Sequence, residues 1–127
     1  MHYTVEFLPK FAQEFANFPL EHQNKVLDFV RTFQLHGLSD FSIYEGKIAP
    51  SWVSGTPEYH FARSNALWHY HIGIPTYVRR HGRYKTSDVV LHFQWKGKGD
   101  HISLVDMYDH YTREGRFYLP SGSYLVR

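Results

Sequence analysis

Two segments of the chain alternate large apolar side chains with histidines, and this two-residue period predicts β-strands whose two faces differ. In the segment ALWHYHIG, an extended backbone would direct Trp68 and Tyr70 to one side and His69 and His71 to the other. In the segment DVVLHFQW, apolar side chains again share one face and His92 lies on the opposite face. We therefore expect a sheet with one aromatic face, which packs on helices, and one face that carries histidines.

The rest of the sequence pattern places this sheet in an α+β fold. Residues 2–8 alternate as a half-buried strand, and phenylalanines then recur at spacings of four and three up to Pro19, which indicates a short amphipathic helix. A second helical pattern runs up to Gly37 and is followed by an irregular loop with a short extended piece around Ile43. Short links between the later strands favour an antiparallel meander with the helical hairpin on one face. These strands are predicted at residues 58–63, 66–73, 87–95 and 101–109, with tight turns at Ser64–Asn65 and residues 97–100.

Length and composition limit the classes of function. A chain of 127 residues is typical of a single domain, residues 1–127, with one hydrophobic core. The absence of cysteine excludes disulfide scaffolds, thiolate metal sites and a cysteine nucleophile. The first residues lack the pattern of a signal peptide and no apolar run is long enough to cross a bilayer, so we expect a cytoplasmic protein without a membrane partner.

A cluster of cations in the middle of the chain predicts an acidic partner. The formal net charge is only +2, but RRHGRYK concentrates positive charge in the connection between two predicted strands. Such a charge run is often only a solvated turn. Its alternative is an RNA-binding loop, in which Tyr77 and Tyr84 would stack on unpaired bases. The residues expected to contact the RNA backbone are Arg79, Arg80, Arg83 and Lys85.

The histidine face permits three interpretations. His69, His71 and His92 share it, and His60 would join them from the neighbouring predicted strand. Imidazoles at alternate strand positions can bind a metal ion, form hydrogen bonds in a partly buried surface, or contact an anionic substrate. The residues after His71 supply no further ligand at a recognisable spacing, so we predict no metal and expect these histidines to border an RNA site.

The end of the last predicted strand offers groups for proton transfer. Asp109, His110 and Tyr111 follow one another where the strand ends. A histidine moves protons near neutral pH, an adjacent carboxylate orients it, and a tyrosine hydroxyl donates to a phosphate oxygen. The triplet alone is also compatible with a purely structural role at a strand end.

These parts, in this order, resemble the RelE/ParE superfamily of toxins from bacterial toxin–antitoxin systems. The resemblance covers residues 3–111 and is carried by YTVEFLPKF, the helical hairpin, YEGKIAPSW, YHFARSNALWHYHIG, VVLHFQW and ISLVDMYDHY. It implies an N-terminal strand and a two-helix hairpin packed on an antiparallel sheet. The chain departs from the family pattern in its expanded basic loop and in a C-terminal extension at about residues 112–127, which would form an extra strand, face an antitoxin or cover the core.

The terminal DHY is similar to the histidine and tyrosine cluster of the mRNA interferases in this superfamily. The resemblance implies a ribosome-dependent endoribonuclease that cleaves mRNA and inhibits translation, with a cognate antitoxin as partner and without a metal or other cofactor. The ribose 2′-hydroxyl would attack the adjacent phosphate and leave a cyclic phosphate. By position, His110 would transfer the proton, Tyr111 would orient or protonate the scissile group, and Asp109 would hold His110. Lys47 and Arg63 would stabilise charge on the phosphate.

Two other functions are compatible with the same residues. Several members of the superfamily inhibit gyrase without nuclease activity, so the chain could be a ParE-like toxin that binds a protein target. The third candidate is a small metalloenzyme with His69, His71 and His92 as ligands. The DHY triplet is the reason to prefer the ribonuclease.

Overall fold

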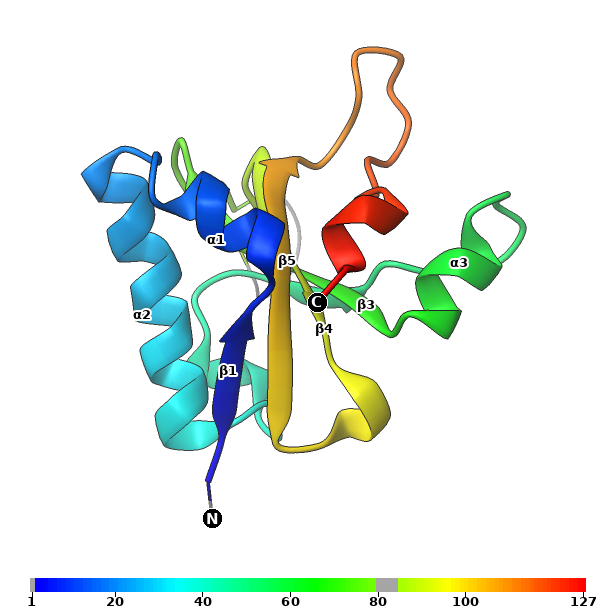
Figure 1. Ribbon diagram of the computed structural model, residues 1–127. Coiled ribbons are helices and arrows are strands. Elements are labelled where there is room, and N and C mark those ends of the chain that lie inside the picture. The colour runs from blue at the N-terminus through cyan, green and yellow to red at the C-terminus, as the bar shows by residue number, and fades with distance from the viewer. Residues whose placement is uncertain (1, 80–84) are drawn as a thin grey trace.

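The protein is an α+β structure in which a five-stranded open sheet carries two helices on one face, as the computed structural model shows (Figure 1). Residues 2–79 and 85–127 are described. This architecture confirms the expected fold class: an N-terminal strand, a helical hairpin and a mostly antiparallel sheet. No helix in these two described ranges is both long and apolar enough to cross a membrane.

The N-terminal strand and the helical hairpin form where the sequence pattern predicts them. Strand β1 (Thr4–Phe7) is followed closely by α1 (Pro9–Phe15), because a proline suits the first turn of a helix. Helix α2 (Leu20–His36) ends at Gly37, whose φ of 68° is readily adopted only by glycine. A Cβ atom at Gly37 would also overlap with the ring of Tyr3, so the chain before β1 lies against the end of α2.

Strand pairing places the longest strand in the interior of the sheet. The remaining strands are β2 (Ile48–Pro50), β3 (Leu67–Ile74), β4 (Val89–Gln94) and β5 (His101–Asp109). The order is β1-β5-β4-β3-β2, and all neighbouring pairs are antiparallel except β1 and β5, which are parallel. The predicted meander of β3, β4 and β5 is therefore confirmed, whereas nothing in the local pattern indicates the pairing of β5 with β1.

The structure corrects the prediction in the segment before β3. Residues 58–63 lie largely in helix α3 (Tyr59–Ser64) rather than in a strand, and Ser64–Asn65 is the end of that helix rather than a hairpin turn. The position beside β3 is taken by β2, in which Ile48 pairs with Tyr70. The edge of β3 that the expected strand would have used is thus occupied by a segment from the preceding loop.

The loop between α2 and β2 contains a short helix rather than an extended piece. Ile43 ends a 3₁₀-helix (Phe41–Ile43), which begins where the side chain of Asp40 accepts a hydrogen bond from the backbone N–H of Ser42. The connection from β4 to β5 is short, as predicted, and contains a second 3₁₀ turn (Lys96–Lys98). The departure at Phe41–Ile43 is local and leaves the long strands unchanged.

The face of the sheet that meets α1 and α2 is lined with aromatic rings, as the alternation predicts. Phe29 of α2 stacks on Tyr70 at a ring-centroid distance of 4.6 Å and lies 5.6 Å from Phe93. Trp68 and Trp95 meet edge to face at 4.9 Å. Such ring pairs add to the stabilisation from apolar burial. The helical hairpin is thereby fixed to one side of β3 and β4, and the histidines of these strands face away from it.

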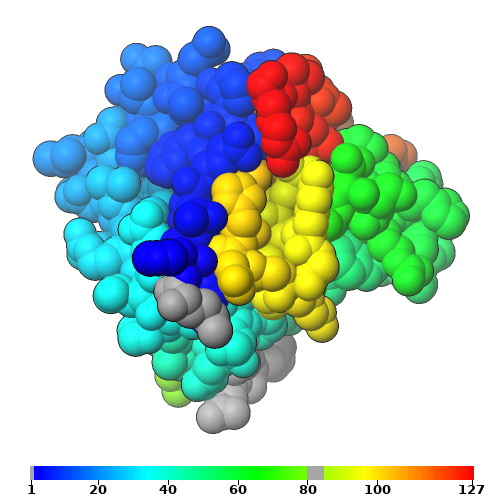
Figure 2. All heavy atoms as spheres, turned by 60° about the horizontal axis from the view of Figure 1, so that its bottom comes forward, coloured from blue at the N-terminus to red at the C-terminus, as the bar shows by residue number. Residues whose placement is uncertain are grey.

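A smaller hydrophobic cluster lies on the other face of the sheet, where α3 and the C-terminal segment pack. Leu67 of β3, Val105 of β5 and Ala62 of α3 belong to this cluster, and Leu119 and Leu125 pack against it. Figure 2 shows the C-terminal residues, in red, between the N-terminal helices in blue and α3 in green. The C-terminal extension therefore covers the core, which is one of the three roles considered for it.

Candidate functional site

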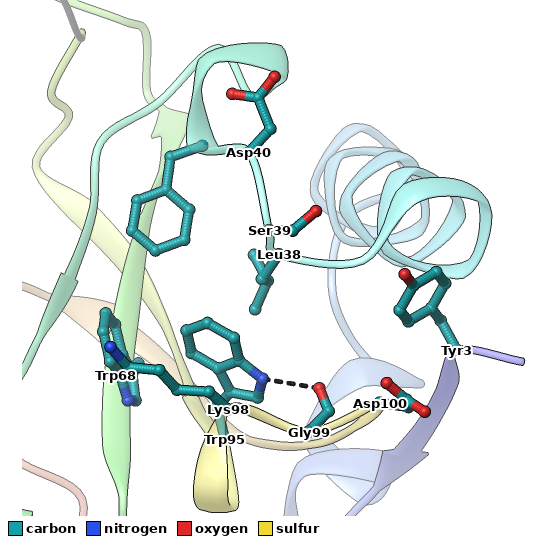
Figure 3. Close-up of a pocket in the computed structure, with 10 residues that line it drawn as sticks. Tyr3, Leu38, Ser39, Asp40, Trp68, Trp95, Lys98, Gly99 and Asp100 are labelled. Atoms are coloured by element: carbon teal, nitrogen blue, oxygen red, sulfur yellow. Dashed lines mark hydrogen bonds between the residues drawn. The ribbon is translucent and has the colours of Figure 1, made fainter. Parts of the chain in front are cut away.

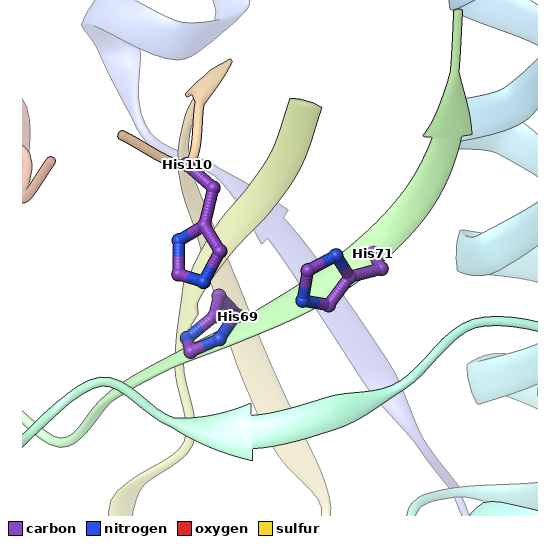
Figure 4. A group of neighbouring side chains, drawn as sticks. All are labelled: His69, His71 and His110. Carbon is purple, nitrogen blue, oxygen red and sulfur yellow. The ribbon is translucent and has the colours of Figure 1, made fainter. Parts of the chain in front are cut away.

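Three histidines meet on the face of the sheet that turns away from α2. His69 and His71 alternate along β3, and His110 follows the last residue of β5 (Figure 4). The ring centroid of His110 lies 4.8 Å from that of His69 and 5.1 Å from that of His71, and the two β3 rings are 5.7 Å apart. Three imidazoles from two strands that are not neighbours in the sheet thus form one cluster.

Hydrogen bonds hold the two β3 histidines in place. Nδ1 of His69 lies 2.9 Å from Oγ of Ser51. Nδ1 of His71 lies 3.0 Å from both the amide nitrogen and the carbonyl oxygen of Ser87. Only 8% of His69 and 5% of His71 is exposed. One nitrogen of each ring is therefore engaged, while Nε2 makes no hydrogen bond with the described residues.

His110 is half-buried and is held by its backbone. Its amide N–H donates to the carbonyl oxygen of Asp88 at 2.8 Å, and its carbonyl oxygen accepts from the amide N–H of Tyr118 at 2.9 Å. Its ring lies 4.6 Å from the ring of Tyr111 and 5.2 Å from that of Phe117. Nδ1 of His110 is buried and has no hydrogen-bond partner among the described residues. Backbone and ring contacts, rather than a carboxylate, position this imidazole.

Burial keeps the cluster neutral. Desolvation and the neighbouring His71 lower the pKa of His110 to about 4. Burial is also the main cause of the lowered pKa values of His69 and His71. At neutral pH all three imidazoles are therefore uncharged, and each carries a lone pair that can accept a proton or bind a metal ion.

His92 lies beneath the cluster and is almost completely enclosed. Only 1% of it is exposed, and neither ring nitrogen has a hydrogen-bond partner among the described residues. Its ring centroid lies 6.2 Å from that of His69 and 5.7 Å from that of Tyr118. Burial lowers its pKa to about 3, so it is neutral. Such an enclosed side chain does not fit the predicted contact with RNA and instead belongs to the floor of the site.

The histidine cluster lines two cavities that share a wall. The inner cavity has a volume of about 250 Å³ and the outer cavity one of about 600 Å³. We refer to the two together as the histidine pocket. The residues that line both are Lys47, His71, His110 and Tyr111.

Lys47 and Tyr111 stand at the rim of the histidine pocket. The amide N–H of Lys47 donates to the carbonyl oxygen of Lys85, and its carbonyl oxygen accepts from the amide N–H of His71, each at 2.9 Å. Tyr111 is 51% exposed, and its ring stacks on Phe117 at 5.2 Å. Lys47, His110 and Tyr111, which were predicted from different parts of the sequence, are thus brought together.

The other two predicted catalytic residues, Asp109 and Arg63, do not take the positions that were predicted for them. Asp109 is exposed and lines the outer cavity, but within the described residues it forms no hydrogen bond with His110. Successive side chains at a strand end point in different directions, so adjacency in the sequence does not bring the carboxylate to the imidazole. Arg63 lies on α3, donates to the hydroxyl of Tyr59 at 2.7 Å and does not line the histidine pocket. His60 is exposed on the same helix, because this segment is not a strand of the sheet.

The basic segment borders the outer cavity at its two described ends. Val78 and Thr86 line this cavity and pair with each other. Arg79 is exposed, whereas the ammonium of Lys85 lies 2.8 Å from a carboxylate oxygen of Glu45. The two described cations of this segment therefore differ. Lys85 is in an ion pair, whereas Arg79 forms no ion pair with a carboxylate of the described residues. Arg80, Arg83 and Tyr84 lie outside the described residues.

Tyr77, which was expected to stack on bases, is part of a contact at the edge of the aromatic core. Its hydroxyl lies 2.8 Å from the hydroxyl of Tyr70. Its ring passes so close to Gly73 that a Cβ atom there would overlap with it. The ammonium of Lys25 lies 5.2 Å from the ring centroid. The ring is therefore engaged within the protein rather than presented to a base.

Several features of the site escape the sequence analysis. Ser51 and Ser87 hold the β3 histidines, but both lie outside the strands and neither was singled out from the sequence. Val90 pairs with both His71 and Tyr108, and the amide N–H of His110 donates to the carbonyl oxygen of Asp88, which together bring His110 near His71. The alternation of β3 and the end of β5 would have indicated this third histidine once the three strands were aligned.

A cavity of about 490 Å³, separate from the histidine pocket, lies near the end of α2 and the turn between β4 and β5 (Figure 3). Trp68 and Trp95 line it, and Nε1 of Trp95 donates to the carbonyl oxygen of Gly99 at 2.9 Å. Among the residues that the structure describes, none of those lining this cavity is a histidine. The clustered imidazoles therefore distinguish the histidine pocket as the candidate site.

Comparison with known proteins adds no assignment: no protein-family model, no curated protein and no solved structure matches this chain. The histidine pocket is thus the basis on which a function is assigned.

Proposed function

We propose that this protein is the toxin of a toxin–antitoxin system and acts in the cytoplasm as a ribosome-dependent endoribonuclease of the RelE/ParE type. The observation that carries the proposal is the meeting of His110, Tyr111 and Lys47 at one pocket. Together they supply a neutral base, a hydroxyl donor and a cation. The N-terminal strand, helical hairpin and sheet are consistent with the same family.

The proposed reaction is an internal phosphoryl transfer that needs no metal ion. His110 accepts the proton of the ribose 2′-hydroxyl, and the oxygen attacks the adjacent phosphorus. Lys47 places its positive charge beside the non-bridging oxygens, where negative charge develops. Tyr111 orients the phosphate and donates a proton to the leaving 5′-oxygen, and the proton on His110 returns to Tyr111 through solvent. The products are a 2′,3′-cyclic phosphate and a free 5′-hydroxyl.

His110 is better suited to proton transfer than the other two histidines of the cluster. It is more exposed than His69 and His71 and contacts the exposed ring of Tyr111. Its lowered pKa keeps it in the proton-accepting form at neutral pH. A bound phosphate would add negative charge beside the ring and raise the pKa of His110 toward neutrality, where a general base is most effective.

The basic segment supplies the binding surface in this proposal. Arg79 is exposed next to Val78, which lines the outer cavity, so an RNA strand that crosses this cavity would pass the cation. Arg80 and Arg83 would extend the contact along the backbone of the messenger or of ribosomal RNA. A cognate antitoxin would block the same surface with an acidic segment.

The test is cleavage of a defined messenger by translating ribosomes, mapped by primer extension. Wild-type protein should cut, and His110→Ala should lose about 100-fold or more of the cleavage rate. Its circular dichroism spectrum and urea midpoint should stay close to those of the wild type. Arg63→Ala is the matched control and should cut at the wild-type rate, because Arg63 does not line the pocket.

Two results would contradict the proposal. Cuts by His110→Ala at the wild-type rate would remove His110 from the mechanism. Growth arrest by the wild type without any cut messenger would exclude the nuclease and favour a ParE-like toxin that binds gyrase or another protein.

A further inference from the structure

The three clustered histidines have the spacing of a metal site. One ring nitrogen from each of His69, His71 and His110 lies within 4.8 Å of the other two. Figure 4 shows His110 reaching from the end of β5 toward the two rings of β3. A tetrahedral Zn²⁺ ion with bonds of about 2.0–2.1 Å holds its nitrogen ligands about 3.3 Å apart. For all three nitrogens to bind one ion, they must therefore come closer together than the 4.8 Å within which they lie.

The hydrogen bonds of the β3 histidines leave the correct nitrogens for a metal ion. Nδ1 of His69 lies 2.9 Å from Oγ of Ser51, and Nδ1 of His71 lies 3.0 Å from both the carbonyl oxygen and the amide nitrogen of Ser87. Metal-binding histidines commonly donate their second ring N–H to an oxygen, which leaves Nε2 as the ligand. Both β3 histidines can adopt this tautomer, because each Nδ1 has an oxygen within hydrogen-bond distance. Proton transfer at His110 requires neither of these two hydrogen bonds.

The chemistry of the ligands selects the class of ion. Imidazole nitrogens suit Zn²⁺ and similar transition-metal ions, whereas Ca²⁺ and Mg²⁺ prefer oxygen ligands. The positive charge of Lys47 at the rim repels a cation. The negative charges of Asp88 and Asp109, which also line the outer cavity, partly offset this repulsion.

We propose that His69, His71 and His110 bind one Zn²⁺ or similar divalent transition-metal ion, with the fourth coordination position open toward the histidine pocket. The inference goes beyond the proposed nuclease, whose chemistry needs no metal. It also differs from the metalloenzyme considered from the sequence, because the third ligand is His110. His92, the third ligand in that candidate, lies in the floor and is not one of the three converging residues.

A bound ion would inhibit the proposed nuclease. Coordination uses the lone pair of His110 that otherwise accepts the proton of the 2′-hydroxyl, so the base is lost while the ion is present. This consequence rests on the proposed function, whereas binding of the ion does not.

The first measurement is a titration of Zn²⁺ into tag-free protein near neutral pH, in competition with a chromophoric chelator. We expect one ion per chain, and affinity weaker by about 100-fold or more in His69→Ala, His71→Ala and His110→Ala. His60→Ala is the control, because His60 is exposed on α3 and outside the cluster. Wild type that binds less than one equivalent, or a control that loses binding equally, would overturn the proposal.

A second measurement separates loss of a ligand from loss of the fold. Wild-type protein loaded with Co²⁺ should show the visible absorption of a four-coordinate site, and Ser51→Ala, which keeps all three ligands, should bind about tenfold more weakly. Octahedral Co²⁺ absorption in the wild type would contradict the site even if a histidine variant did not fold. Folded histidine variants that bind one equivalent at wild-type affinity would place the ion elsewhere and overturn the proposal.

Cleavage assays with Zn²⁺ or with a chelator distinguish this proposal from the nuclease. Cleavage by a protein that binds no Zn²⁺ would overturn the metal site and support the nuclease. If the protein binds one equivalent of Zn²⁺ but does not cleave the messenger when a chelator keeps it free of metal, the metal site is supported and the nuclease is contradicted. Cleavage that is lost when Zn²⁺ saturates the protein, and restored by chelator, is the result expected if both hold.

Discussion

The two faces of the sheet are built by the same alternation, but they meet different neighbours. On the aromatic face, Phe93 lies against Phe29 of α2, and both rings are buried without any need for hydrogen bonds. On the histidine face, the same strands present His69 and His92 toward a pocket and the C-terminal segment. One face of the sheet is therefore a closed core, and the other is a core with a polar opening.

The difference shows what burial does to each kind of ring. Removing a phenylalanine from water is favourable, whereas removing an imidazole from water is unfavourable unless its nitrogens find partners. His69 and His71 have such partners, but His92 has none among the described residues. Stability alone would favour apolar residues there, so neutral histidines at this place mark the pocket as the candidate functional site.

The largest expected effect on stability is at the centre of the aromatic face. Phe93→Ala removes a fully buried ring that contacts Phe29, and it should lower the free energy of unfolding by about 3–5 kcal/mol. Urea unfolding followed by tryptophan fluorescence measures this change. Phe117→Ala, at the more exposed rim of the histidine pocket, is the comparison and should lower it by less. Similar losses for both variants would remove the distinction between a closed core and an open pocket.

Acid should act on the histidine face and leave the aromatic face unaffected. An unfolded chain takes up a proton on each histidine near pH 6.5, whereas the pKa of His92 in the folded protein is about 3 and that of His110 about 4. Between these values the unfolded state binds more protons. The free energy of unfolding therefore falls as the pH decreases below about 6.5, and for the enclosed His92 the slope approaches about 1.4 kcal/mol per pH unit.

Asp106 titrates in the opposite direction and partly offsets this loss. Burial raises the pKa of its carboxyl to about 6, so the folded protein takes up this proton before the unfolded chain does as the pH falls. Its contribution to stability is lost as the pH rises through about 6. Urea unfolding at about pH 7, 6 and 5 measures the sum of both effects. A free energy of unfolding that stays constant or increases toward about pH 5 would show that the histidines are not buried in the neutral form.

Replacement of the enclosed imidazole should make the two faces more alike. His92→Leu exchanges two unpartnered nitrogens for apolar atoms of similar volume, so it should raise the free energy of unfolding at neutral pH by about 1 kcal/mol. The dependence of this free energy on pH should also become shallower than in the wild type. A destabilised variant with an unchanged pH dependence would mean that His92 is stabilised by a partner.

The smallest expected effect on stability is at the rim of the histidine pocket. Lys47→Ala removes an exposed cation and should change the free energy of unfolding by less than about 0.5 kcal/mol. It should nevertheless slow messenger cleavage by about 100-fold, because the positive charge that stabilises the negative charge developing on the phosphate oxygens is lost. Lys96→Ala, an exposed cation outside the pocket, is the matched control. Equal cleavage rates for the two variants would remove Lys47 from the proposed mechanism.

The faces of the sheet could be predicted because alternation is a local property of the sequence. The same rule failed for α3, since Tyr59, Phe61 and Arg63 also alternate, and only the pairing of β2 with β3 shows that no strand fits there. Tyr111 was singled out at the end of a predicted strand and Lys47 through the family resemblance. Their contact with one pocket could not be predicted, because it depends on where separate loops meet. Arg63 was misplaced for the same reason.

Pairing between distant parts of the chain also sets when the site can form. Thr4 of β1 pairs with His101 of β5, and β5 joins β1 to the rest of the sheet. A growing polypeptide that has exposed β1, both helices and β3 still lacks the strand that unites them, as well as His110. During translation the histidine pocket therefore cannot assemble until β5 and His110 have left the ribosome.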